Sequence, residues 1–213
     1  MTLRTKTLAL VGATLLGLVG LLNYAGRAVV LQSFRELEDQ AVRRDVARAA
    51  SVLSEELDAL DGQALDRSNW DDTCAFVADG NAAYVASNLT ESSFANIRVN
   101  LMVFMRTSGE IVAARWLDLA TKQFAELPLT FQQDWSGDNP LLQRALEPDG
   151  LKGLIVLSEG AVLLAGRPIL SSRAEGPARG AFFIGCALDA AKTAYLGQIA
   201  NLELSFKRPG ADE

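Results

Sequence analysis

The residues best suited to bind a ligand are the adjacent Trp70, Asp71 and Asp72. Two neighbouring carboxylates beside an indole ring could hold the ammonium group of a ligand, with the ring supplying a cation–π contact. They could also hold a hard cation such as calcium, and Asp71 is the preferred candidate for either role. A structural explanation is open as well: Asp72 would cap the short helix that follows, and Trp70 would fill the core between a helix and a sheet.

Arg115 and Arg167 lie in two different predicted strands, and each shares one face of its strand with apolar residues. A charge in such a place needs a partner, because an unpaired buried charge is costly. We expect Arg167 to meet the carboxylate of Asp71, of Asp118 or of a ligand. Arg115 has the same choice, so both are either ion-pair struts within the protein or ligand contacts.

The composition excludes several kinds of chemistry. The 213 residues contain no histidine and two cysteines, which excludes a Ser-His-Asp triad and a structural zinc site, and no cofactor is expected. The formal net charge of -6 argues against a nucleic-acid partner, which would need an excess of lysine and arginine. Cys74 and Cys186 lie in different predicted elements, so we expect two separate buried thiols.

The N-terminus has the pattern of a membrane anchor. Segment 7–26 is uncharged and about as long as a helix that crosses a bilayer. Arg4 and Lys6 precede it, so residues 1–6 are predicted to form a cytoplasmic tail and the rest of the chain to be exported. A cleaved signal peptide is the alternative, although Asn23 suits a cleavage site poorly.

Residues 27–66 are predicted to form a long juxtamembrane helix. Apolar residues recur there every three or four positions, at Val42, Val46, Ala49, Leu53, Leu57 and Leu60. The charged residues between them form a solvated face or, alternatively, a dimer seam. Small residues at Ala9, Ala13 and Gly17 would let two membrane helices approach closely, which favours a homodimer, although such residues are common in membrane helices in general.

The remaining chain, residues 67–200, is predicted to be an α+β domain. Apolar runs bounded by turn residues predict an antiparallel sheet of about five strands, at 100–106, 111–119, 154–158, 161–170 and 179–188. The first strand is apolar on both faces and should be central, covered by the long helix on one side. Segment 120–146, a helical and loop insertion, or a ligand pocket would cover the other side.

The end of the chain is predicted to hold one more helix and one more strand. Asp189 would cap a short helix over 190–200, and the alternating Leu202, Leu204 and Phe206 indicate a sixth strand. We expect residues 201–213 to lead toward a second membrane span and an output domain that this sequence does not contain. A long helix feeding an antiparallel sheet with a central insertion is similar to the plan of PAS-like sensors, also called Cache domains.

Two motifs carry a resemblance to a known family. The first runs from Asp66 to Val77 (DRSNWDDTCAFV) and is followed by Tyr84 and Asn88. The second is an apolar run ending in A-G-R-P-I-L at Leu170, followed by a polar loop with G-P-A-R-G. Their order and spacing resemble the CHASE extracellular sensor domains of the fourth class, over roughly residues 34–196. The family pattern has Trp and Tyr where this chain has Arg67 and Cys74.

The resemblance implies a sensory input domain outside the inner membrane of a bacterium or archaeon, in the periplasm where there is one. Such domains feed histidine kinases, diguanylate cyclases and phosphodiesterases, or chemoreceptors. The expected ligand-binding residues are Trp70, Asp71, Asp72, Asn88, Arg115 and Arg167, around a pocket between the sheet and segment 66–90. The bound molecule would be an unidentified small ligand, with dimerisation through residues 9–60.

Two other functions stay open. An exported hydrolase could use two carboxylates, drawn from Asp66, Asp71, Asp72 and Asp118. A dimerisation module without a small ligand is the other alternative. We expect a binding domain and not an enzyme.

Overall fold

The computed structural model describes residues 3–157 and 160–206. By its internal contacts the chain divides into two compact units, residues 1–48 and 49–213. The first unit is the early part of helix α1, which extends over Leu3–Ser68 and so includes all of the predicted helix 27–66. Among the residues that the structure describes, no helix combines the length and the hydropathy of a membrane span.

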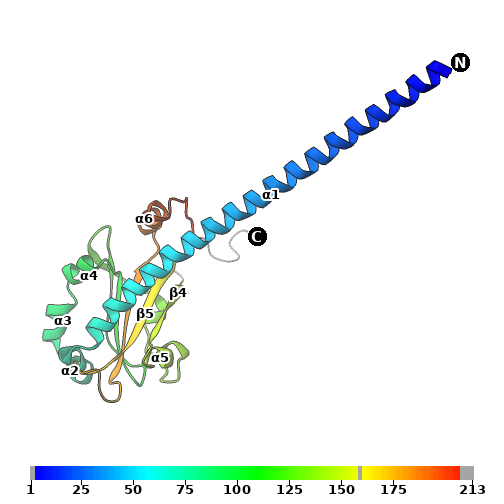
Figure 1. Ribbon diagram of the computed structural model, residues 1–213. Helices are drawn as coiled ribbons and strands as arrows, with labels where there is room; N and C mark the ends of the chain where they lie inside the picture. Colours follow the sequence, from blue (N-terminus) through cyan, green and yellow to red (C-terminus); the bar gives the residue numbers. More distant parts are fainter. Residues whose placement is uncertain (1–2, 158–159, 207–213) are drawn as a thin grey trace. The chain divides into compact units, whose positions relative to one another are not determined.

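The second unit is an α+β domain built on one antiparallel sheet, with more strands than expected (Figure 1). The strands are β1 (Leu101–Arg106), β2 (Ile111–Asp118), β3 (Gln123–Ala125), β4 (Leu151–Val156), β5 (Ala161–Ile169) and β6 (Gly180–Ala187). Their order across the sheet is β3-β2-β1-β6-β5-β4. All five expected strands are present, and β1 is central as predicted. The central position of β1 follows from its sequence, because a strand that is apolar on both faces needs cover on both.

The sixth strand lies where the sequence predicted a loop and short helices. Strand β3 has three residues and pairs with β2 through Leu117 and Phe124, too short a run to give an alternating pattern. The prediction of a further strand at Leu202, Leu204 and Phe206 is wrong, because the structure has no strand in this segment. These apolar side chains alternate because they pack against the hydrophobic core, and no neighbouring strand pairs with them in the described part of the chain.

Helices cover one face of the sheet. They are the end of α1, α2 (Asp71–Asp79), α3 (Ala82–Asn88), α4 (Glu91–Ile97) and α6 (Ala190–Ala200). Met102 and Phe104 of β1 point into this core, where Phe104 stacks on Phe182 with ring centroids 4.6 Å apart. The long helix therefore covers the sheet as the sequence predicted.

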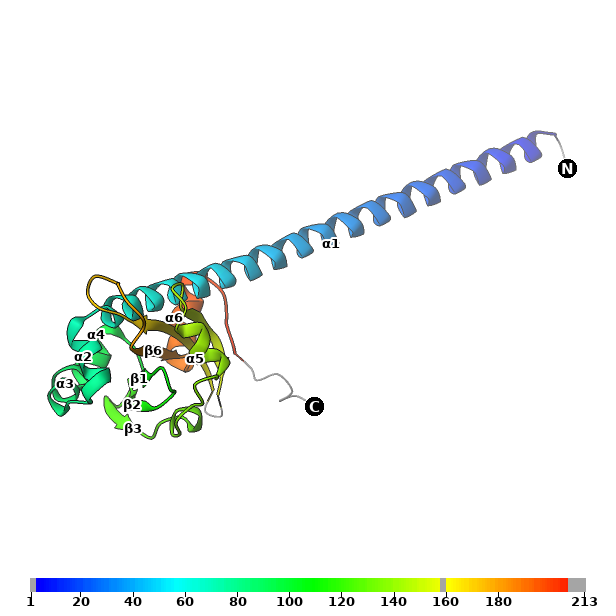
Figure 2. The same cartoon turned by 90° about the horizontal axis from the view of Figure 1, so that it is seen from below.

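The insertion between β3 and β4 covers the other face (Figure 2). It contains a 3-10 turn, η1 (Leu129–Phe131), and helix α5 (Pro140–Ala145). Leu101, Val103 and Met105 of β1 meet this insertion in a second buried cluster with Phe131 and Trp135, among others. The sequence left two possibilities for the cover of this face, segment 120–146 or a ligand pocket. In the structure, segment 120–146 covers it.

Local sequence signals explain where the helices begin and end. The side-chain oxygens of Asn81, Thr90 and Asp189 accept hydrogen bonds from backbone N–H groups at the starts of α3, α4 and α6, and Asp189 is the cap that was predicted. Helix α2 ends at Gly80, whose left-handed φ of 67° suits glycine. The helices around the first motif are thus short and individually capped.

Asn100 holds three strands together at the centre of the sheet. Its side chain is buried and donates to the Leu117 carbonyl at 3.0 Å, while its oxygen accepts from the Ala187 N–H at 2.9 Å. One amide therefore joins the start of β1 to β2 and to β6. The site residues on both sides are carried by this rigid frame.

Candidate functional site

The two adjacent carboxylates of the first motif have different environments. Both lie in the first turn of α2, where the positive end of the helix dipole favours negative charge. Asp71 accepts two hydrogen bonds from Ser172, from its N–H at 2.9 Å and its hydroxyl at 2.8 Å. These bonds, the backbone one first, lower the pKa of Asp71. Asp71 thus joins α2 to the polar loop after β5, which is the second motif.

Asp72 lines a hollow between α2 and α3, two helices that lie side by side in Figure 2. The hollow has a volume of about 250 Å³, and Asn88 lines it too, so two predicted site residues that are sixteen positions apart come together. The other polar residues of its lining are Asn81, Tyr84 and Ser87. The idea that Asp72 caps a helix is wrong, because Trp70 occupies the N-cap position of α2 and Asn81 caps α3.

The polar groups around the hollow are held in place by short-range bonds. Asn88 donates from Nδ2 to the Tyr84 carbonyl at 3.2 Å and to the Ser87 hydroxyl at 3.0 Å. The Tyr84 hydroxyl lies 2.6 Å from the Thr73 hydroxyl, and burial raises the pKa of Tyr84. Asp72 is the carboxylate of the lining, and amide and hydroxyl groups surround it. This arrangement suits a small cationic ligand that also carries hydrogen-bonding groups.

Trp70 does not fill the core, since 37% of its surface is exposed. The guanidinium of Arg67 lies 5.3 Å from the centre of its ring and supplies the cation–π contact that was expected of a ligand. Arg67 also donates from Nη1 to the Asn88 carbonyl at 3.2 Å, and its burial lowers its pKa. The sequence signal for this role was that Arg67 departs from the family pattern.

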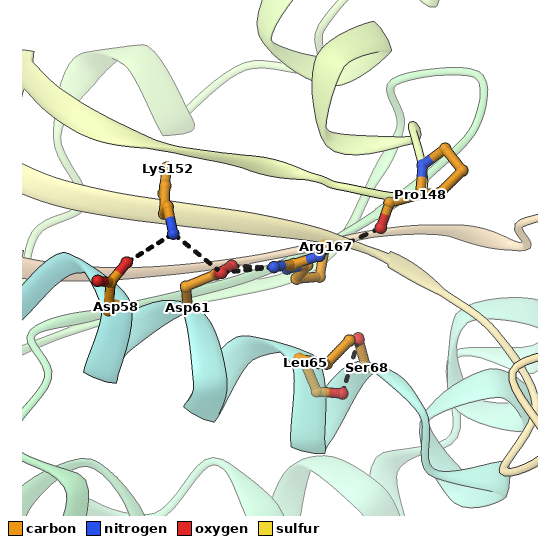
Figure 3. A network of polar contacts seen from close by, with 7 residues as sticks. All are labelled: Asp58, Asp61, Leu65, Ser68, Pro148, Lys152 and Arg167. Atoms are coloured by element: carbon orange, nitrogen blue, oxygen red, sulfur yellow. Dashed lines mark hydrogen bonds and ion pairs between the residues drawn. The ribbon is translucent and has the colours of Figure 1, made fainter.

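Arg167 is the ion-pair strut that was expected, whereas Arg115 forms no ion pair among the residues that the structure describes. Arg115 donates to the Leu89 carbonyl at 3.1 Å, and its guanidinium lies 4.7 Å from the centre of the Phe124 ring. Arg167 makes a two-bond ion pair with Asp61 of α1 and donates to the Pro148 carbonyl at 3.1 Å (Figure 3). The hydrogen bonds that Arg167 donates to Asp61 raise the pKa of Arg167.

The partners predicted for Arg167 were therefore wrong. Asp71 is bound to Ser172, and Asp118 accepts from the Ala120 N–H and the Thr121 hydroxyl, both at 2.9 Å, which lowers the pKa of Asp118. Asp71 is thus occupied by the loop after β5, and Asp118 by the turn that follows it in the chain. Asp61 reaches Arg167 because α1 lies on the same face of the sheet.

Helix α1 is tied to the sheet and to α6 by ion pairs, which we call the α1 clamp. Its members are Glu56 with Lys192 (2.5 Å), Asp58 with Lys152 (2.6 Å) and Asp61 with Arg167, and Asp61 also lies 3.7 Å from Lys152 (Figure 3). The pair of Asp61 and Arg167 is the most buried, with side chains 10% and 14% exposed. The charged residues of the predicted helix were expected to be solvated or at a dimer seam, and of these Glu56 binds α6 instead.

Two further expectations concern cysteines and metals. Cys74 is half-buried, Cys186 is buried, and neither forms a disulfide, as predicted. Within residues 3–157 and 160–206, no three acidic or cysteine side chains gather as metal ligands would.

Comparison with known proteins decides the family. The sequence model of the CHASE4 domain matches residues 52–207. The chain belongs to the CHASE4 domain family. This family is the one that the two sequence motifs indicated, and the match begins in the last part of α1 and includes the whole sheet and α6.

One curated relative by sequence is the methanogenesis regulatory histidine kinase FilI of Methanothrix harundinacea (strain 6Ac). It is 29% identical over 204 residues, which is 96% of this chain and 23% of that protein. The chain therefore spans about a quarter of the length of this relative.

Two solved structures share the fold. One is the extracellular domain of a protein described as a histidine kinase, vpHK1S-Z8, with a TM-score of 0.53, 14% identity, and coverage of 74% of this chain and 61% of that one. The other is a domain of a sensory box/GGDEF family protein from Vibrio parahaemolyticus, with a TM-score of 0.52, 12% identity, and coverage of 75% and 63%. The CHASE4 domain thus has the fold of sensor domains from signalling proteins.

Proposed function

We propose that this CHASE4 domain is the ligand-sensing input of a membrane-bound receptor and passes a conformational signal along α1. The observation that carries the proposal is the α1 clamp. The helix that contains the predicted anchor segment 7–26 is bonded to β4, β5 and α6 near its other end. A ligand that favours one arrangement of the domain would therefore also favour one position of α1, in the way that ligands shift populations.

The ligand site in this proposal is the hollow between α2 and α3. Asp72 supplies the negative charge, and Asn81, Ser87 and Asn88 supply amide and hydroxyl groups. A small molecule with an ammonium group and a hydrogen-bonding group would satisfy these residues. Trp70 and Asp71 act as supports of the site, because Arg67 and Ser172 already bind them.

The membrane part of the proposal rests on the sequence. An uncharged segment 7–26 preceded by Arg4 and Lys6 favours an inner-membrane anchor with the domain on the outer side. The small residues of that segment support a homodimer through the membrane and juxtamembrane helices. A histidine kinase or a GGDEF-type output domain would fit the relatives that share the sequence or the fold.

The experiment is a thermal-shift screen of the full chain against amines, amino acids and divalent cations. A ligand at a hundred times its dissociation constant adds about 2.7 kcal/mol to the stability, which raises the melting temperature by about 5–11 °C. The Asp72→Asn variant should lose this rise. Asp66→Asn is the matched control, because it removes the same charge from an exposed residue outside the hollow.

Two results would contradict the proposal. If the rise that an amine without a carboxylate produces survives in Asp72→Asn, the ligand binds elsewhere and the site is wrong. If no compound of the screen raises the melting temperature, a dimerisation module becomes the better explanation of the fold.

A further inference from the structure

A second cavity lies on the α1 side of the sheet, away from the hollow between α2 and α3. Its volume is about 110 Å³, and its walls come from α1, the junction of α4 and β1, strands β5 and β6, and α6. Its polar lining consists of Glu56, Gln63, Arg98, Lys192 and Tyr195. A cavity with this lining is unlike the apolar cavities that stay empty in proteins, so it is suited to a polar occupant.

Gln63 gives the first indication of what that occupant is. Its side-chain oxygen is buried and has no hydrogen-bond partner in the described part of the chain. Buried acceptors are almost always paired in native proteins, because an unpaired one loses its bond to water on folding. A molecule in the cavity that donates a hydrogen bond would satisfy this oxygen.

The charges of the lining give the second indication. Glu56 and Lys192 neutralise each other at 2.5 Å. Arg98 has no ion pair among the residues that the structure describes, and it is exposed, so it lies at the mouth of the cavity. The lining thus has one uncompensated positive charge.

The backbone of Arg98 supports a role for its side chain. Arg98 ends α4 in the left-handed region, with φ at 55° and ψ at 45°. Glycine or asparagine is usual at such a position, since a longer side chain is disfavoured there. An arginine at this place is not explained by the helix end itself.

The size of the cavity limits the occupant. An engineered apolar cavity of about 150 Å³ accommodates benzene, with six carbon atoms. By proportion, 110 Å³ has room for about four or five non-hydrogen atoms.

We propose that this cavity binds a small carboxylate with a hydrogen-bond donor on the neighbouring carbon, of which glycolate and glycine are the simplest examples. Its carboxylate would pair with Arg98 and its hydroxyl or ammonium group would donate to Gln63. Such a molecule links α1 to the α4–β1 junction, next to the Glu56 and Lys192 pair of the α1 clamp. The cavity is therefore a second input to α1, and it does not depend on a ligand between α2 and α3.

Isothermal titration of the full chain tests this assignment with four probes. Glycolate and glycine have both groups, acetate lacks the donor, and ethanolamine lacks the carboxylate. For ligands of this size we expect saturable one-to-one binding of glycolate, with a dissociation constant between about 10 µM and a few mM, and competition between glycolate and glycine. Acetate should bind at least about tenfold more weakly, and ethanolamine should not displace glycolate.

Four variants assign the binding to this cavity. Arg98→Gln should weaken binding by about tenfold or more. Arg98→Lys keeps the positive charge and should retain most of the wild-type affinity. Gln63→Leu should reduce the affinity for glycolate to that for acetate, and it should raise the melting temperature of the free protein because it removes an unpaired buried acceptor. Asp72→Asn, in the other hollow, should leave the binding of glycolate unchanged, since glycolate has no ammonium group.

Several outcomes would overturn the proposal. They are the absence of saturable binding for all four probes, equal affinity for glycolate and acetate, and unchanged binding in Arg98→Gln. Loss of binding in Asp72→Asn would move the ligand to the hollow between α2 and α3. A crystal structure grown with glycolate that shows only water in the cavity would also reject it.

Discussion

The α1 clamp provides a quantitative test, because two of its carboxylates lie three residues apart and differ in burial. Asp61 and Arg167 have side chains 10% and 14% exposed, whereas those of Asp58 and Lys152 are 59% and 47% exposed. We consider the variants Asp61→Ala and Asp58→Ala, which each remove one carboxylate from the same helix. The two changes have the same effect on helix propensity and on net charge.

The expected losses of stability differ severalfold. Removing one partner of a buried pair costs about 3–5 kcal/mol, because the other charge stays buried without a partner. Arg167 keeps its bond to the Pro148 carbonyl and has some access to water, so we expect about 3 kcal/mol for Asp61→Ala. An exposed pair contributes about 0–1 kcal/mol, so Asp58→Ala should cost less than about 1 kcal/mol.

Urea unfolding of the full chain, followed by tryptophan fluorescence, measures this difference. With a slope of about 2 kcal/mol per M, the midpoint should fall by about 1.5 M for Asp61→Ala and by less than about 0.5 M for Asp58→Ala. The pair Asp61→Leu with Arg167→Met should recover most of the loss, since an apolar pair can replace a buried ion pair. Equal shifts in the two alanine variants would refute the reasoning from burial.

Three further predictions concern other contacts of the domain. The hydrogen bonds from Ser172 lower the pKa of Asp71, so their contribution to stability is present above about pH 4 and is lost as the pH falls below it. The difference in melting temperature between wild type and Asp71→Asn should therefore shrink below about pH 4, and a constant difference would contradict the pairing. Asn100→Ala leaves two buried backbone groups unpaired and should cost about 2–4 kcal/mol in urea unfolding, whereas a loss below 1 kcal/mol would show that water replaces the amide. Burial raises the pKa of the Cys186 thiol, so at neutral pH an alkylating reagent should label Cys74 at least about tenfold faster, as mass spectrometry of digests would show; equal rates would argue against the burial of Cys186.

The main strands could be predicted because each leaves a local pattern in the sequence. The apolar run from Leu101 to Met105 is continuous, and such a run indicates a strand that is buried on both faces. Strand β3 escaped prediction because three residues are too few to show a period. The alternation at 202–206 had another cause, the packing of its apolar side chains on the core.

The candidate site could be predicted only in part, because ion-pair partners depend on distant segments. Asp72 and Asn88 are close in sequence, and the family motif includes both, so the sequence could predict that they contribute to one site. The partner of Arg167 is 106 positions away on another element, and the spacing of residues says nothing about that distance. Arg67 was noted only because it departs from the family motif, yet its guanidinium packs over the ring of Trp70.

The α1 clamp also determines which movements of the helix the domain resists. A helix turns about 100° per residue, so Glu56 and Asp61 project about 140° apart around the axis, while Asp58 lies about 60° from Asp61. The helix is therefore held from two flanks, by α6 on one and by β4 and β5 on the other. Rotation of α1 relative to the domain would pull at least one flank apart. The clamp thus ties residues 56–61 of α1 to the domain against rotation about the helix axis, a constraint that a single ion pair would not supply.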